Sequence, residues 1–129
     1  MVLQEFEHEV ATRLQSCRIE LNWQQKLGDV PITLSYAQYR HYISMLREII
    51  SNIMKYANAQ SVIIEISLLD SQLVSVICDD GNGFDGETNQ SEGNGLKNLR
   101  ERATELSATL HFQSLPEAKG SRVELIFPL

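Results

Sequence analysis

Apolar and polar positions alternate with two different periods along the chain, and these periods predict its helices and strands. Helices are indicated where apolar side chains return every three or four residues, and strands where apolar and polar residues alternate or apolar residues run together. We expect helices over residues 3–14, 35–57 and 96–106. We expect strands over residues 17–23, 62–66, 73–78, 110–112 and 123–127.

Local signals mark the ends of these elements. Ser35 is suited to cap the long helix, which contains no Pro or Gly. Asp70-Ser71 separates two strands by so little chain that a hairpin turn is expected there. Short connections favour antiparallel pairing, so the sheet should be mixed and mostly antiparallel. The sequence therefore predicts an α/β fold, a two-layer sandwich with the helices on one face of the sheet.

Composition narrows the function classes. The chain has 129 residues, which is enough for one domain with a single core, and we expect that domain to span residues 1–129. Its net charge of -6 argues against a nucleic-acid partner or an anionic membrane surface. No apolar run approaches the roughly 20 residues needed to cross a bilayer. Cys17 and Cys78 are expected to be buried reduced thiols, which fits a cytosolic protein.

Two glycine-rich segments carry the strongest chemical signal. Residues 79–84 (Asp-Asp-Gly-Asn-Gly-Phe) follow an apolar strand, and residues 93–96 (Gly-Asn-Gly-Leu) precede a helix. Glycine lets backbone approach a ligand closely, and a helix N-terminus offers free N–H groups to a phosphate. The carboxylate of Asp79 would repel phosphate, but it can accept a hydrogen bond from the exocyclic amine of a base. Together the two segments suggest a nucleotide held at both ends.

The long helix contributes a polar cluster within one arc of its surface, at Glu48, Asn52, Lys55 and Tyr56. An ordinary solvated face of an amphipathic helix would explain these residues. A site for a metal and a nucleotide would also use them, because an amide oxygen can bind Mg²⁺, a carboxylate can act as a base, and an ammonium can meet phosphate. Helix periodicity leaves both explanations open.

The glycine segments have rival explanations as well. The first could be a calcium loop, but its spacing does not match an EF-hand, or it could be a simple Asn-Gly turn. The second could be an ordinary helix entry. The sequence contains no Gly-x-x-x-x-Gly-Lys-Ser/Thr run and no six-position dinucleotide fingerprint, so P-loop and Rossmann sites are excluded.

The order of the three segments decides among these readings. Residues 48–57, 79–83 and 93–98 resemble the N, G1 and G2 boxes of the GHKL ATPases. The likeness is closest to the catalytic and ATP-binding domain of bacterial sensor histidine kinases, a Bergerat-type fold. Residues 95–103 look like the subgroup that pairs with LuxR-type response regulators, and residues 120–129 resemble the family's closing strand.

This resemblance implies a role for each matching position. Asp79 would accept the adenine amine's hydrogen bond, Ser121 would help to fix the base, and Glu48 would orient or deprotonate the attacking group. Asn52 would bind the Mg²⁺ that bridges the phosphates of ATP. The remaining implied ATP-binding residues are Lys55, Tyr56, Gly81, Gly83, Gly93, Gly95, Leu96 and Asn98.

The chain departs from the family pattern at three positions and lacks one part of the reaction. Tyr56 replaces a histidine, Ile53 is bulkier than usual, and Ser121 replaces a threonine. The family transfers phosphate to a histidine on a two-helix dimerisation hairpin, and too few residues lie between His8 and the strand near Ile19 to build the second helix of such a hairpin.

The expected function is therefore that of a cytoplasmic, monomeric kinase domain that acts on a separate phosphoacceptor domain and, indirectly, on a response regulator. The alternative is a stand-alone GHKL regulatory module, similar to an anti-sigma switch, without histidine phosphotransfer.

Overall fold

The computed structural model describes residues 3–27, 34–81, 95–115 and 120–129 of the chain. Its helices are α1 (Gln4–Ser16), α2 (Tyr36–Asn52), the π-helical turn η1 (Ile53–Ala57) and α4 (Gly95–Glu105). Its strands are β1 (Glu20–Lys26), β2 (Ser61–Leu69), β3 (Gln72–Asp79), β4 (Thr109–Ser114) and β5 (Ser121–Pro128).

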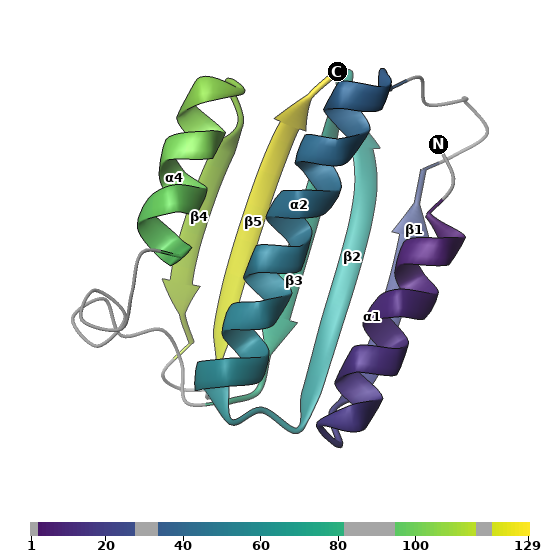
Figure 1. Cartoon of the computed structure of the whole chain (residues 1–129), viewed down its shortest axis with the longest axis vertical. Coiled ribbons are helices and arrows are strands. Elements are labelled where there is room, and N and C mark those ends of the chain that lie inside the picture. The colour runs from purple at the N-terminus through teal and green to yellow at the C-terminus, as the bar shows by residue number, and fades with distance from the viewer. Residues whose placement is uncertain (1–2, 28–33, 82–94, 116–119) are drawn as a thin grey trace.

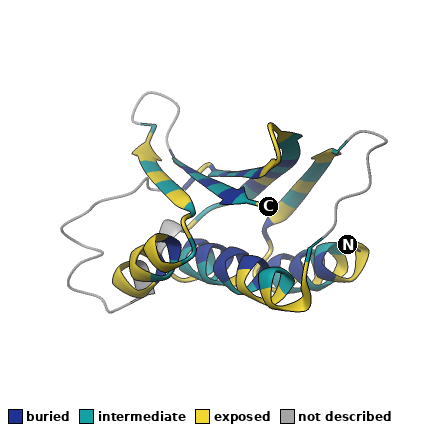
Figure 2. Cartoon of the chain, turned by 90° about the horizontal axis from the view of Figure 1, so that it is seen from above, coloured by how far each residue is buried: buried dark blue, intermediate teal, exposed yellow. Residues whose placement is uncertain are grey.

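The strands form one five-stranded sheet in the order β1-β2-β3-β5-β4. β1 pairs parallel with β2, and the β2–β3, β3–β5 and β4–β5 pairs are antiparallel. The helices that the structure describes lie against one face of this sheet, as Figure 1 and Figure 2 show. The predicted two-layer sandwich with a mixed, mostly antiparallel sheet is therefore confirmed.

The hairpin between β2 and β3 is also confirmed. Asp70 and Ser71 both have positive φ, at 50° and 62°. This conformation is that of a type I′ turn, whose twist matches the twist of the two strands that it joins.

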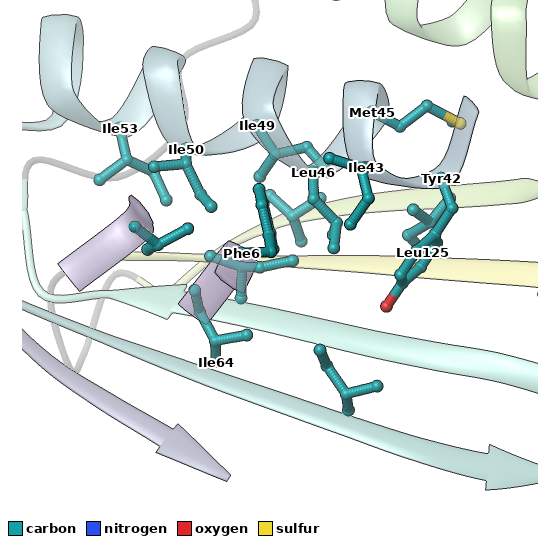
Figure 3. Packing of buried hydrophobic residues seen from close by; sticks show 14 of the residues in the cluster. Phe6, Tyr42, Ile43, Met45, Leu46, Ile49, Ile50, Ile53, Ile64 and Leu125 are labelled. Carbon is teal, nitrogen blue, oxygen red and sulfur yellow. The ribbon is translucent and has the colours of Figure 1, made fainter. Parts of the chain in front are cut away.

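The core lies between the sheet and the apolar side of α2. Alternate residues of β2 point into it, so Val62, Ile64 and Ile66 are buried while Ile63 between them is 43% exposed. Figure 3 shows Leu46, Ile49 and Ile50 of α2 directed toward the sheet, with Phe6 of α1 among them. Tyr42 and Met45 of α2 are also fully buried.

One buried hydrogen bond ties α2 to β3. The hydroxyl groups of Tyr42 and Ser75 lie 2.5 Å apart, and both residues are fully buried. Burial raises the pKa of Tyr42 above its ordinary value, because the phenolate would be desolvated. The ring of Tyr42 meets Phe127 edge-on, with the ring centroids 5.5 Å apart.

Tyr42→Phe is expected to lower the free energy of unfolding by about 1–2 kcal/mol, because it leaves the buried Ser75 hydroxyl without its partner. Chemical denaturation of the wild type, both single variants and Tyr42→Phe/Ser75→Ala would measure this. We expect the double variant to be less destabilised than the sum of the single variants. Simple additivity would show that the two hydroxyl groups do not depend on each other.

The first strand begins later than its alternating pattern predicts. Cys17 ends α1, and Arg18 adopts a left-handed conformation with φ of 59°. The N–H of Ile19 then donates to the carbonyl of Leu14, so the chain is still turning where a strand was expected. Cys17 is exposed, and its predicted burial was therefore wrong, whereas Cys78 is partly buried. Both thiols are free, as predicted, and burial raises the pKa of Cys78.

The long helix begins as predicted but changes form near its end. Ser35 accepts a hydrogen bond from the N–H of Gln38, whose side chain accepts from the N–H of Ser35, which completes a capping box. The α-helical part ends at Asn52 and continues as the π-helical turn η1. Asn58, with φ of 52°, then turns the chain toward β2. Wider π-helical turns occur frequently at functional sites.

Candidate functional site

Three elements bring the predicted site residues to one end of the sheet. The C-terminal end of α2, the end of β3 and the beginning of β5 lie at this end in Figure 1, and α4 begins toward it. The strand register places Asp79 opposite Ser121 on β5 and opposite Val62 on β2. Residues far apart in sequence thus surround the end of β3.

Asp79 lies at the centre of this arrangement. Its side chain is buried, with the residue only 5% exposed. One carboxylate oxygen accepts a 2.9 Å hydrogen bond from the N–H of Gly81, and the other accepts a 2.5 Å hydrogen bond from the hydroxyl of Ser121. Each oxygen of a carboxylate can accept more than one hydrogen bond, so Asp79 keeps capacity for a further donor. Hydrogen bonds thus join three of the predicted site residues, Asp79, Gly81 and Ser121.

Gly120 was expected only as the first residue of the segment that resembles the family's closing strand, and no role at the site was assigned to it. Its φ is +123°, which side chains rarely allow, and a Cβ there would lie 1.9 Å from the carbonyl oxygen of Asp79. Only glycine lets β5 begin this close to the end of β3. Gly120 therefore makes possible the approach that places Ser121 on the carboxylate of Asp79.

Asp80 has a different role from its neighbour, and the sequence did not indicate it. Its carboxylate accepts hydrogen bonds from the N–H of Gln60, the N–H of Ser61 and the hydroxyl of Ser61. These bonds join the end of β3 to the beginning of β2 and lower the pKa of Asp80, the bond from the N–H of Ser61 contributing most. Asp79 thus faces the site while Asp80 holds the strand ends together.

Because the pKa of Asp80 is lowered from 3.8 by folding, its contribution to stability is present above that value and is lost as the pH falls through the lower folded-state pKa. Asp80→Asn is expected to cost about 1 kcal/mol at neutral pH, since this exposed group is screened by solvent. The difference from wild type should shrink in acid unfolding experiments near pH 3. Asp70→Asn is the control, because Asn tolerates the left-handed turn, and it should cost almost nothing. A constant difference for Asp80→Asn at all pH values would contradict this assignment.

The side of the site formed by α2 carries Glu48 and Asn52, one helical turn apart. Both residues are partly exposed, and Lys55 on η1 is exposed. An uncharged amide oxygen at Asn52 suits Mg²⁺ that is already bound by phosphate oxygens. Within the described parts of the chain, no group of three or more His, Cys, Asp and Glu residues could hold a metal ion by itself.

Several predicted site residues remain predictions. Gly83 and Gly93 lie outside the described residues, as do the side chains of Tyr56 and Leu96. Gly95 is the first residue of α4, and Asn98 is exposed on that helix. The structure therefore brings together the base-binding part of the predicted site and leaves its proposed phosphate-binding loop untested.

Residues 37–129 match the family of histidine kinase-, DNA gyrase B- and HSP90-like ATPases. The chain belongs to this family. The match begins in α2 and includes Glu48, Asn52, Asp79 and Ser121, so the predicted GHKL resemblance is confirmed.

Curated relatives in this family are sensor proteins. Sensor protein VraS of Staphylococcus aureus (strain COL) is 39% identical over 89 residues, which are 69% of this chain and 25% of VraS. Sensor protein VraS of Staphylococcus epidermidis (strain ATCC 12228) is 38% identical over 89 residues, again 69% of this chain and 25% of VraS. The chain thus spans about a quarter of the length of the curated relatives that it matches.

Solved structures of histidine kinases share this fold. The catalytic domain of histidine kinase ThkA has a TM-score of 0.75 at 13% identity, with 99% of this chain and 94% of that chain covered. The blue-light activated histidine kinase of Erythrobacter litoralis has a TM-score of 0.71 at 22% identity, with 98% of this chain and 42% of that chain covered.

Among the described residues, no helix is both long and apolar enough to span a membrane.

Proposed function

We propose that this chain is a Mg²⁺- and ATP-binding kinase domain that donates the γ-phosphoryl group to a histidine on a separate dimerisation domain in two-component signalling. The observation that carries the proposal is the buried carboxylate of Asp79, held by Gly81 and Ser121 at the end of β3 in a chain of the ATPase family.

The geometry of Asp79 supports adenine as the base. A carboxylate only accepts hydrogen bonds, so it favours the amine of adenine over the carbonyl oxygen that guanine carries at the corresponding position. Burial of Asp79 strengthens this preference for adenine, because water cannot separate the carboxylate from a second hydrogen-bond acceptor on the base. The hydroxyl of Ser121 and the N–H of Gly81 keep the carboxylate from rotating away.

The polar side of α2 supports the phosphate end. Asn52 would hold Mg²⁺ through its amide oxygen, and the ion would supply charge neutralisation to the phosphates. Glu48 lies one turn earlier on the same helix and would accept the proton of the attacking imidazole as its nitrogen bonds to the γ-phosphorus and the bond to the departing ADP oxygen breaks. Lys55 would meet phosphate oxygens.

The partners follow from the same proposal. The domain would work in the cytoplasm, where ATP is available, as a monomer that docks with the phosphoacceptor domain of its parent kinase. The phosphohistidine would then serve a response regulator, which residues 95–103 suggest to be of the LuxR type. The relatives described above are sensor proteins and histidine kinases, which favours this function over a stand-alone regulatory module.

Incubation with γ-labelled ATP, Mg²⁺ and the matching phosphoacceptor domain tests the proposal. We expect label on the acceptor histidine, and its loss with Glu48→Gln at nearly unchanged ATP affinity. Tight ATP binding with no labelled histidine would contradict the kinase function and favour the regulatory module.

Asn52→Ala is expected to weaken ATP binding about tenfold in the presence of Mg²⁺ and little in its absence, because only the metal-dependent contact is removed. Stability should change by less than about 1 kcal/mol, since Asn52 is partly exposed. Calorimetric titration with and without Mg²⁺, together with thermal unfolding, measures both effects. Unfolding of the variant would show that Asn52 is a packing residue.

A further inference from the structure

Two side chains of α1 hold two side chains of α2. The guanidinium of Arg47 donates two hydrogen bonds to the carboxylate of Glu9, at 2.8 and 2.7 Å. The guanidinium of Arg13 donates a 3.0 Å hydrogen bond to the hydroxyl of Ser51. Both contacts join residues that are 38 positions apart in sequence.

The first of these contacts is better defined than an ordinary surface ion pair. The paired, parallel hydrogen bonds of Arg47 fix the plane of its guanidinium. The same group lies 5.9 Å from the centre of the Phe6 ring, which is buried beneath it. Figure 3 shows Phe6 among the apolar side chains that α2 directs toward the sheet. Arg47 is thus held from α1 by a carboxylate and an aromatic ring together.

The two α2 residues that contact α1 are direct sequence neighbours of the proposed site residues Glu48 and Asn52. Glu9 and Arg13 are one turn apart on α1, and Arg47 and Ser51 are one turn apart on α2. On α2, Arg47 directly precedes Glu48, and Ser51 directly precedes Asn52. Any rotation or sliding of α2 that moved Glu48 and Asn52 would therefore also break the contacts with α1.

The second contact lies where the helix changes form. Ser51 comes immediately before Asn52, the last α-helical residue, and η1 begins at Ile53. A π-helical turn accommodates one extra residue, so its position along a helix decides where the side chains next to it point. The bond from Arg13 fixes the last α-helical turn and with it the direction of Asn52.

We infer that Glu9 and Arg13 of α1 are positioning residues, which set the orientation of Glu48 and Asn52 toward Mg²⁺ and the triphosphate by holding Arg47 and Ser51. This inference rests on the proposed function. α1 precedes the family match, which covers residues 37–129, whereas the fold match to the catalytic domain of ThkA covers 99% of this chain.

Calorimetric titrations with adenosine, with ATP alone and with ATP and Mg²⁺ test the inference. The ratio of the two ATP affinities measures the gain from Mg²⁺, while adenosine reports only on the site around Asp79. For Glu9→Ala/Arg13→Ala we expect this gain to fall about fivefold, with adenosine affinity unchanged within about twofold. Ser51→Ala, a milder change that keeps the helix, should lower the gain about twofold and have no further effect in the Arg13→Ala background.

Glu65→Ala is the matched control, because it removes another exposed ion pair, the one with Lys26 of β1, and because Glu65 alternates with the buried Ile64 and Ile66 and so lies on the face of the sheet turned away from α2. It should leave the gain from Mg²⁺ unchanged. A full gain in the α1 variants would overturn the inference while the proposed function stands. Equal losses of adenosine and Mg²⁺-dependent binding would overturn it too, since they would indicate general destabilisation. No adenine nucleotide binding by the wild type would instead refute the proposed function.

Discussion

Asp79→Asn is expected to weaken ATP binding about a hundredfold while the chain stays folded. The variant places an amide where the carboxylate accepts hydrogen bonds from Gly81 and Ser121. An amide has only one acceptor oxygen, and its NH₂ group would face either one of these donors or the adenine amine. Loss of a charged acceptor in a buried position accounts for about 2–3 kcal/mol of this effect. Calorimetric titration of the variant with ATP measures it.

Asp80→Asn provides the control for this substitution, because the same chemical change is made at the next residue. Asp80 bonds only to the beginning of β2 in the described contacts, so its variant should lose stability and keep its ATP affinity within about threefold. A similar loss of affinity in both variants would place the base elsewhere than at Asp79.

Gly120→Ala is expected to lower the free energy of unfolding by about 3 kcal/mol or more. Its new Cβ would lie 1.9 Å from the carbonyl oxygen of Asp79, in a backbone conformation with φ of +123° that alanine rarely adopts. Relief of this overlap requires β5 to move away from β3, and that movement separates Ser121 from the carboxylate of Asp79. The variant should therefore lose both stability in urea and adenosine affinity.

Gln113→Ala is a suitable control for this variant, since Gln113 is exposed on β4 and pairs with Arg122 near the beginning of β5. Because Gln113 pairs with Arg122, Gln113→Ala should change the unfolding free energy by less than about 0.5 kcal/mol and leave adenosine binding intact. Wild-type stability and affinity in Gly120→Ala would mean that the beginning of β5 is not fixed against β3 as described.

Local patterns of the sequence predicted the elements that depend on local physics. The cap at Ser35 and the hairpin at Asp70-Ser71 are formed by residues whose own side chains or backbone preferences specify them. The same patterns placed a strand at Cys17, because alternation continues through a left-handed turn at Arg18 that has no glycine to mark it. The π-helical form of η1 also left no periodic signal over so short a segment.

The candidate site, like the fold, could be predicted from the sequence only in part. Asp79 was a candidate because its carboxylate follows an apolar strand, Ser121 was assigned only through the family resemblance, and the structure brings the two together. Their contact depends on Gly120 and on the pairing of β3 with β5, strands that lie more than 40 residues apart, as the separation of 42 positions between Asp79 and Ser121 shows. Asp80 could not be told apart from Asp79 by residue type, because only the direction of alternate strand residues separates their roles. The buried hydroxyl of Tyr42 required a partner from β3 that helix periodicity does not reveal.

Calorimetric titration of the unmodified chain with ATP and with GTP in excess Mg²⁺ tests the central claim most directly. We expect saturable ATP binding with a dissociation constant below about 1 mM, and GTP binding at least about tenfold weaker, because Asp79 accepts hydrogen bonds and cannot donate one. No ATP binding at millimolar concentration, or equal affinities for ATP and GTP, would contradict it.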